Sequence, residues 1–206
     1  MSGLTTTEAI DAVIAAGRRA AALGLVPATA GNFSVRTGES IAITRTGRDK
    51  GQLGPEDVAV ISLAAPVGND LSAETALHLT RYRADPAVGA VFHVHSPMAA
   101  VLGRRYEPEG QLILQGWELQ KGFAGVTDHL TAVRVPVLRN DQDMTILAAT
   151  VERELQREHD GITAPAYLVA GHGVNVWGRT PKDAQRHLEA LEALLALHKH
   201  WTEFRS

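Results

Sequence analysis

Apolar positions along the chain recur with two different periods, and the changes between them divide the sequence into expected helices and strands. Spacings of three and four residues, opened by a capping side chain or a proline, indicate helices. These helices are expected over 7–23, 71–82 and 143–158, and from 96 and 180 onward. Short alternating or continuous apolar runs between turn-forming residues indicate strands. These strands are expected within 28–46, over 57–63, 88–95 and 131–138, and on both sides of 171–173.

Two stretches are less regular. Pro136 removes a backbone donor from the expected strand 131–138, which predicts that this strand lies at a sheet edge or ends early. Residues 111–125 indicate partly a strand and partly a loop or short helix.

The order of the elements predicts the fold class. Some strands follow one another as hairpins and others are separated by helices, which favours a mixed sheet with helices on both faces. We therefore expect residues 1–206 to form a single α/β domain. Its architecture would be a three-layer α/β/α sandwich with a central mixed, largely antiparallel sheet.

The composition narrows the chemistry. A net charge of −3 gives no basic surface for nucleic acid or for an anionic membrane. The chain has no cysteine, so any metal ligand must be histidine, aspartate or glutamate. No apolar run is long enough to span a bilayer, and the first helix does not have the pattern of a signal peptide. These features predict a cytoplasmic enzyme or binding protein.

Two histidines end the apolar stretch 88–95. In a strand, His93 and His95 point to the same face. A helix start at Ser96 and Pro97 places them at the carboxyl end of that strand, where α/β sheets often carry their sites. Packed or hydrogen-bonded histidines would give the same pattern, so a third ligand is needed to favour a metal.

His172 offers that third imidazole. It lies between two glycines directly after another apolar run, although a turn histidine bonded to the backbone would look the same. With His93 and His95 it completes a three-histidine set with one coordination position open, which is typical of catalytic zinc. A divalent ion held in this way can polarise a carbonyl group.

Two glutamates are candidates for proton transfer. Glu74 lies in the first turn of an expected helix, where the helix dipole also explains a carboxylate. Glu118 lies beside Trp117 and Leu119, where a carboxylate is more often functional or paired, and Lys121 offers it a salt bridge. The residues alone do not choose between the two.

Groups that bind a phosphate dianion recur in three places. Gly31 and Asn32 begin a strand, Thr46 and Gly47 follow a strand, and Ser72 begins a helix. Each is also a common turn. No Walker or Gly-x-Gly-x-x-Gly pattern is present, so nucleotide binding has little support.

The chain resembles the class II aldolase/epimerase (aldolase II/adducin) superfamily through an ordered set of short motifs. These are Gly31-Asn32-x-Ser34, Thr46-Gly47, Ser72-x-Glu74, His93-x-His95-Ser96 and Gly171-His172-Gly173. Within the superfamily it is most similar to the methylthioribulose-1-phosphate dehydratases, through residues 46–51, 118–122, 140–143 and 171–179. Adducin-type relatives lack the metal histidines, whereas this chain keeps all three.

The resemblance implies roles for individual residues. His93, His95 and His172 would hold one zinc ion per subunit, and Glu118 falls where the dehydratases keep their acid/base glutamate. Glu74 falls where the aldolases keep theirs, which leaves its role open. The residues implied around the substrate phosphate are Gly31, Asn32, Thr46, Gly47 and Ser72.

Two further implications follow from the resemblance. Aldolases often have a second serine where this chain has Ala73, and Arg48 or Lys50 could offset the missing hydroxyl. The superfamily also implies a homotetramer with the site near a subunit boundary.

The implied reaction is the zinc-dependent dehydration of 5-methylthioribulose 1-phosphate to 2,3-diketo-5-methylthiopentyl 1-phosphate in methionine salvage. The same metal site would also serve a class II sugar-phosphate aldolase or 4-epimerase of the fuculose- or ribulose-phosphate type, which is the alternative. A metal-stabilised oligomer or sugar-phosphate-binding protein without activity is a third possibility. A chelator separates it from the enzymes, because a structural metal would be needed for the fold itself.

Overall fold

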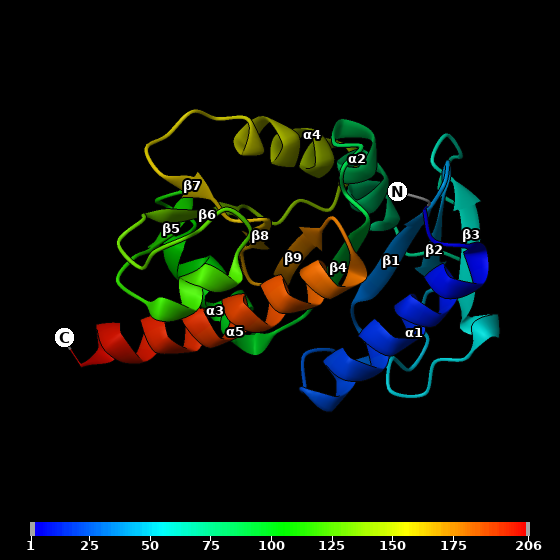
Figure 1. Ribbon diagram of the computed structural model, residues 1–206, viewed down its shortest axis with the longest axis horizontal. Coiled ribbons are helices and arrows are strands. Elements are labelled where there is room, and N and C mark those ends of the chain that lie inside the picture. Colours follow the sequence, from blue (N-terminus) through cyan, green and yellow to red (C-terminus); the bar gives the residue numbers. More distant parts are fainter. Residues whose placement is uncertain (1–2, 205–206) are drawn as a thin grey trace.

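The computed structural model describes residues 3–204 and places a mixed sheet between two layers of helices (Figure 1). The strands lie in the order β3-β2-β1-β4-β9-β8-β6-β5, with β7 paired to β6. The strands are β1 Asn32–Thr37, β2 Ser40–Thr44, β3 Val58–Ser62, β4 Ala90–Val94, β5 Gln111–Leu114, β6 Val133–Leu138, β7 Ile162–Thr163, β8 Ala166–Val169 and β9 Gly173–Gly178. The α-helices are α1 Thr6–Ala22, α2 Thr75–Ala84, α3 Pro97–Tyr106, α4 Met144–Leu155 and α5 Pro181–Glu203. Short 3₁₀ turns are η1 Pro27–Thr29, η2 Pro55–Asp57 and η3 Glu118–Gly122.

The sheet confirms the predicted fold class. Within residues 3–204, β6 pairs in parallel with β7 and β8, and the remaining strand pairs are antiparallel. The first helix ends as expected, with Gly24 in the left-handed region directly after its last residues. No helix among the described residues is both long and apolar enough to cross a membrane.

Helices α1, α3 and α5 cover one face of the sheet, and α2 and α4 cover the other (Figure 1). Strand β4 packs against both layers. Phe92 and Val94 lie in the core with α1, α3 and α5, whereas Val91 lies in the core with α2. Because successive side chains of a strand alternate between faces, His93 lies on the α2 side.

Two expectations were wrong in detail. Strand β6 is interior rather than an edge, although it contains Pro136. It pairs with β7 at Val133 and Arg134 and with β8 at Val137 and Leu138. Pro136 therefore falls where the strand changes partner, so its missing N–H costs no ladder bond there. Helix α2 begins at Thr75, a turn later than predicted.

Candidate metal centre and active site

His93 and His95 leave the end of β4 on the same side, as predicted, with ring centres 4.8 Å apart. His93 is completely buried, and its Nδ1 lies 3.0 Å from the Val174 carbonyl of β9. A carbonyl accepts only, so Nδ1 is the donor of this bond and Nε2 is the nitrogen that faces the other histidines and Glu74. Ser96 then accepts a hydrogen bond from the Ala99 amide and starts α3, which ends the strand at the histidine pair.

His172 reaches the same place from the turn before β9. Its backbone N–H donates to the Val169 carbonyl, and its ring centre lies 4.9 Å from that of His93 and 4.5 Å from that of His95. The following glycine is required by close packing, because a Cβ at Gly173 would overlap the Val94 carbonyl. The predicted three-histidine set therefore comes together in the structure.

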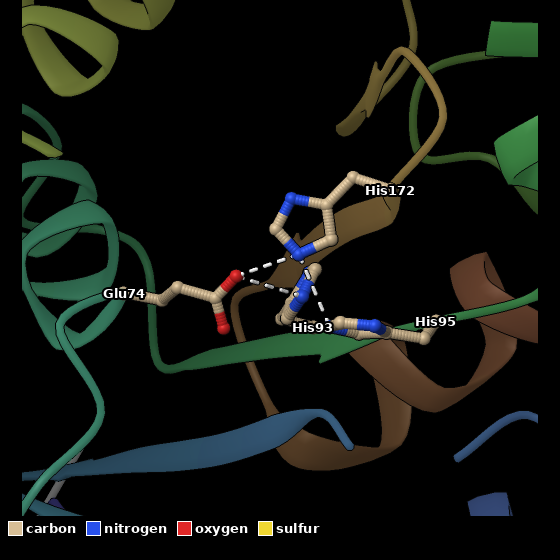
Figure 2. A group of neighbouring side chains, drawn as sticks. All are labelled: Glu74, His93, His95 and His172. Atoms are coloured by element: carbon tan, nitrogen blue, oxygen red, sulfur yellow. Dashed lines mark hydrogen bonds and ion pairs between the residues drawn. The ribbon is translucent and has the colours of Figure 1, made fainter. Parts of the chain in front are cut away.

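Glu74 joins the three imidazoles from the start of α2 (Figure 2). Its Oε1 lies 2.8 Å from His172 Nε2 and 3.3 Å from His93 Nε2. Its Oε2 accepts hydrogen bonds from Asn32 Nδ2 at 2.7 Å and from Ser72 Oγ at 3.4 Å. Between the two glutamates that the sequence left open, Glu74 is the one at the histidines.

The four side chains fit a divalent metal ion. Their ligand atoms all lie within 4.8 Å of one another, and His95 Nε2 faces His172 Nε2 at 3.1 Å. Ligands about 2.1 Å from a tetrahedral ion would lie about 3.4 Å apart, which is close to the distances of 2.8, 3.1 and 3.3 Å among His172, His95, His93 and Glu74. His93 Nε2 is buried without a hydrogen-bond partner among the described residues. A cation at the centre would satisfy all four groups, and Glu74 takes the corner that the sequence left open.

The charges at this centre are consistent with such an ion. Burial raises the pKa of Glu74, but the charges and hydrogen bonds of His93 and His172 outweigh it and hold that pKa far below its usual range. Burial, together with the neighbouring His93 and His172, lowers the pKa of His95 to about 4. An ionised Glu74 and a neutral His95 are the protonation states in which these two side chains coordinate a metal.

The candidate phosphate-binding residues lie at the start of β1, after β2 and before α2, and hydrogen bonds link these segments to Glu74 or to one another. Asn32 and Ser72 contact the Glu74 carboxylate, as described above. The Thr46 N–H donates to the Asp70 carbonyl, which ties the loop after β2 to the loop before α2. Gly31 and Gly47 both adopt positive φ, at 80° and 71°.

Glu118 is placed differently. It lies on η3 with its side chain 70% exposed, and its carboxylate pairs with Lys121 Nζ at 2.6 Å and His129 Nδ1 at 3.2 Å. It is not one of the four clustered residues. The Lys121 hydrogen bond is the main cause that lowers the pKa of Glu118. The catalytic role of Glu118 therefore stays a prediction, and the expected Lys121 salt bridge is present.

The structure also contains a buried polar network that the sequence reasoning missed. His78 Nδ1 lies 2.7 Å from Ser34 Oγ, which in turn lies 3.0 Å from the Tyr82 hydroxyl. Complete burial, with the charge of His93, lowers the pKa of His78 to about 3. The four-residue spacing of Glu74 and His78 in one helix was the available signal, since it places both on one face.

The sheet order and the converged Glu/His group define a class II aldolase-type α/β protein with a candidate metal centre. The chain belongs to the Class II Aldolase and Adducin N-terminal domain family, whose sequence model matches residues 11–198.

Similar proteins support this assignment. Over 199 residues the chain is 51% identical to the methylthioribulose-1-phosphate dehydratase of Bradyrhizobium sp. (strain BTAi1), covering 93% of this chain and 92% of the relative. It is 46% identical over 198 residues to the methylthioribulose-1-phosphate dehydratase of Parvibaculum lavamentivorans, covering 96% of each. Among solved structures, L-fuculose-1-phosphate aldolase from Thermus thermophilus is similar, with a TM-score of 0.75 and 27% identity. That match covers 94% of this chain and 97% of the aldolase.

Proposed function

We propose that this protein is a metal-dependent hydro-lyase that dehydrates 5-methylthioribulose 1-phosphate to 2,3-diketo-5-methylthiopentyl 1-phosphate, a step of methionine salvage. The observation that carries the proposal is the convergence of three imidazoles and Glu74 at the end of β4, in a chain 43–51% identical to dehydratases of this name. We also propose that residues 1–206 form one domain, that the protein is located in the cytoplasm and that it assembles as a homotetramer.

His93, His95 and His172 are the proposed ligands of one zinc ion per subunit, with Glu74 as the neighbouring carboxylate. When bound, a divalent ion supplies Lewis acidity toward the carbonyl and hydroxyl oxygens of the substrate. Histidine nitrogens and carboxylate oxygens suit zinc, and the absence of cysteine excludes a thiolate site. Asn32 and Ser72 hold the second oxygen of Glu74, which fixes this carboxylate beside the three histidines.

The substrate phosphate is proposed to lie against the start of β1, the loop after β2 and the loop before α2. Its contacts would be hydroxyls and amides of this set, with Thr46 contributing its hydroxyl because its amide is bonded to Asp70: Gly31, Asn32, Thr46, Gly47 and Ser72. The contacts among these loops support the proposal, since Ser72 and Asn32 both reach Glu74 and Thr46 is bonded to the Ser72 loop through Asp70. Backbone amides and hydroxyls bind a dianion without requiring a high net charge.

Glu118 is the proposed acid/base group. A carboxylate takes the C3 proton of the substrate, the electron pair forms the C2–C3 double bond of an enol, and the C4 hydroxyl leaves with a returned proton as water. As the C4 hydroxyl leaves, the C2 carbonyl forms again and the double bond moves to C3–C4. The resulting enol takes a proton at C4 and ketonises to the diketone. Within its own chain Glu118 is exposed and lies outside the cluster. We therefore infer that it serves the centre of another subunit in the tetramer.

A substrate comparison tests the proposed function. Purified, metal-loaded protein is incubated separately with 5-methylthioribulose 1-phosphate, fuculose 1-phosphate and ribulose 5-phosphate, and the products are followed by mass. We expect loss of one water from the first substrate alone. Cleavage of a substrate into two smaller products would indicate an aldolase. An unchanged mass with altered stereochemistry would indicate an epimerase. No change with any substrate would contradict the proposal.

A further inference from the structure

Lys50 is a buried cation that the proposed reaction does not yet use. Its side chain ends in the interior with only 2% of the residue exposed, which is rare for lysine. Its Nζ donates to the Thr29 carbonyl at 2.6 Å and to the Arg48 carbonyl at 2.8 Å. Both partners are neutral, so these contacts occupy two of the three ammonium donors without cancelling the charge.

The two acceptors belong to different loops of the candidate phosphate site. Thr29 precedes Gly31 and Asn32, and Arg48 follows Thr46 and Gly47. The Lys50 ammonium is thus a bridge between the loop that enters β1 and the loop that leaves β2. A change in its position would alter the separation of the two sets of amides that are proposed to face the phosphate.

The loop on the Thr29 side needs such a restraint. Ala28 and Thr29 have φ of 52° and 62°, in the left-handed region that residues with a Cβ rarely adopt. Two consecutive residues in that region are costly and persist only where surrounding contacts hold them. Both side chains are exposed, so the hydrogen bond from Lys50 to the Thr29 carbonyl is an important part of that restraint.

The opposite loop is braced as well. Asp49 Oδ1 accepts from the Gly51 amide at 2.8 Å, and the Arg48 side chain pairs with Asp57 at 3.4 Å. The loop that presents the Arg48 carbonyl is therefore fixed on both sides of Lys50.

We propose that Lys50 is a positioning residue for the substrate phosphate. Its buried ammonium ties the 27–32 loop to the 46–50 loop and fixes the distance between the two loops that would bind the phosphate. This inference rests on the proposed function, because it takes the substrate to be a phosphate ester. A positive charge held between these two loops also favours binding of a dianion over a neutral sugar.

The test compares the wild-type holoenzyme with Lys50→Met, which keeps the length of the side chain but removes the charge and the donors. We expect Lys50→Met to weaken binding of inorganic phosphate, measured by calorimetry, roughly tenfold and to raise KM by a similar factor. Metal content and kcat should stay close to wild type. Lys50→Arg should recover most of the affinity, since it keeps charge and donors. Lys182→Met, an exposed lysine of α5, is the control for net charge.

The outcomes separate this inference from the proposed function. Wild-type protein that binds phosphate in a Lys50-dependent way but dehydrates nothing would overturn the function and support the role of Lys50. Normal turnover with unchanged phosphate affinity and KM in Lys50→Met would overturn the role of Lys50 alone, even if that variant is less stable. Failure of the wild type to bind phosphate would overturn it too.

A second measurement covers the case in which Lys50→Met does not fold. Hydrogen exchange of the wild-type holoenzyme, with and without inorganic phosphate, reports the two loops directly. We expect phosphate to protect amides in 29–32 and 46–50 together, because Lys50 couples them. Protection confined to one loop, or to neither, would overturn the inference.

Discussion

Glu74 and Glu118 are both candidates for proton transfer, and their surroundings differ in almost every respect. The Glu74 side chain is 14% exposed, and its carboxylate faces two imidazoles, an amide and a hydroxyl. Glu118 pairs with Lys121 and His129 on a surface turn. A carboxylate enclosed by histidines is placed to hold a cation, whereas Glu118 lies at the surface outside the histidine group. The difference assigns the position at the histidines to Glu74, and the acid/base role proposed for Glu118 has to be tested separately.

The largest expected effect is that of Glu118→Gln. Removing a general acid/base should lower kcat on the order of 10²–10⁴-fold. Metal content should be unchanged, because Glu118 lies outside the clustered ligands. Steady-state kinetics and metal analysis of the same preparation test this, with the exposed Glu109→Gln as the matched control. Near-normal turnover in Glu118→Gln would move the acid/base role to Glu74.

Subunit mixing sharpens that result. Glu118→Gln and His93→Ala are each expected to be inactive, the first for lack of the acid/base and the second for lack of metal. Oligomers assembled from both chains should regain activity if Glu118 acts on the centre of a neighbouring subunit. Mixed oligomers that stay inactive would place both groups in one chain.

Glu74→Gln should mainly weaken metal binding. The substitution removes the negative charge that faces His93 Nε2 and His172 Nε2 while keeping an oxygen that can accept from Asn32. We expect metal affinity to fall about 10–100-fold, as is typical for loss of an anionic partner at a metal centre. Competition with a chelator measures the affinity. An unchanged affinity would mean that Glu74 does not coordinate, and that its nearness to the histidines serves another purpose.

The stability of the protein should depend on pH through His78, which is buried in the interior near Glu74. Burial lowers the pKa of His78 to about 3, whereas an unfolded chain binds the proton near 6.5. The unfolded state therefore takes up a proton first as the pH falls, and stability is lost from about pH 6.5 downward. Between pH 6.5 and 5 the free energy of unfolding should fall by about 1–2 kcal/mol from this histidine alone.

Urea unfolding of metal-free protein at several pH values measures this slope. His78→Gln, which keeps a side-chain partner for Ser34, should flatten it, whereas the exposed His200→Gln should not. Equal slopes of the free energy of unfolding against pH for the wild type and His78→Gln would mean that the folded protein does not lower the pKa of His78.

The sequence predicted much of this arrangement because the relevant signals are local. A two-residue spacing in a strand fixes the shared direction of His93 and His95, and a glycine-flanked turn presents His172. The choice of Glu74 was out of reach, since it depends on how α2 sits over β1 and β4. The edge position predicted from Pro136 was wrong for the same reason, because the change of β6 from one partner strand to another is a tertiary feature. Lys50 likewise shows its role only when two loops on either side of the β1–β2 hairpin are seen to share its ammonium.

The smallest expected effect comes from Lys121→Met. The hydrogen bond from Lys121 is the main cause of the lowered pKa of Glu118, so its removal should let that pKa rise toward the ordinary value. If the Glu118 carboxylate is the base, it must be ionised, and the acidic limb of kcat/KM against pH should then move to higher pH. Stability should not change measurably, because an exposed ion pair contributes little to folding. Lys199→Met, which removes a similar surface pair with Glu203, should leave the profile in place. An unmoved profile in Lys121→Met, beside an inactive Glu118→Gln, would mean that Glu118 titrates in a setting that another subunit creates, where Lys121 is no longer its main partner.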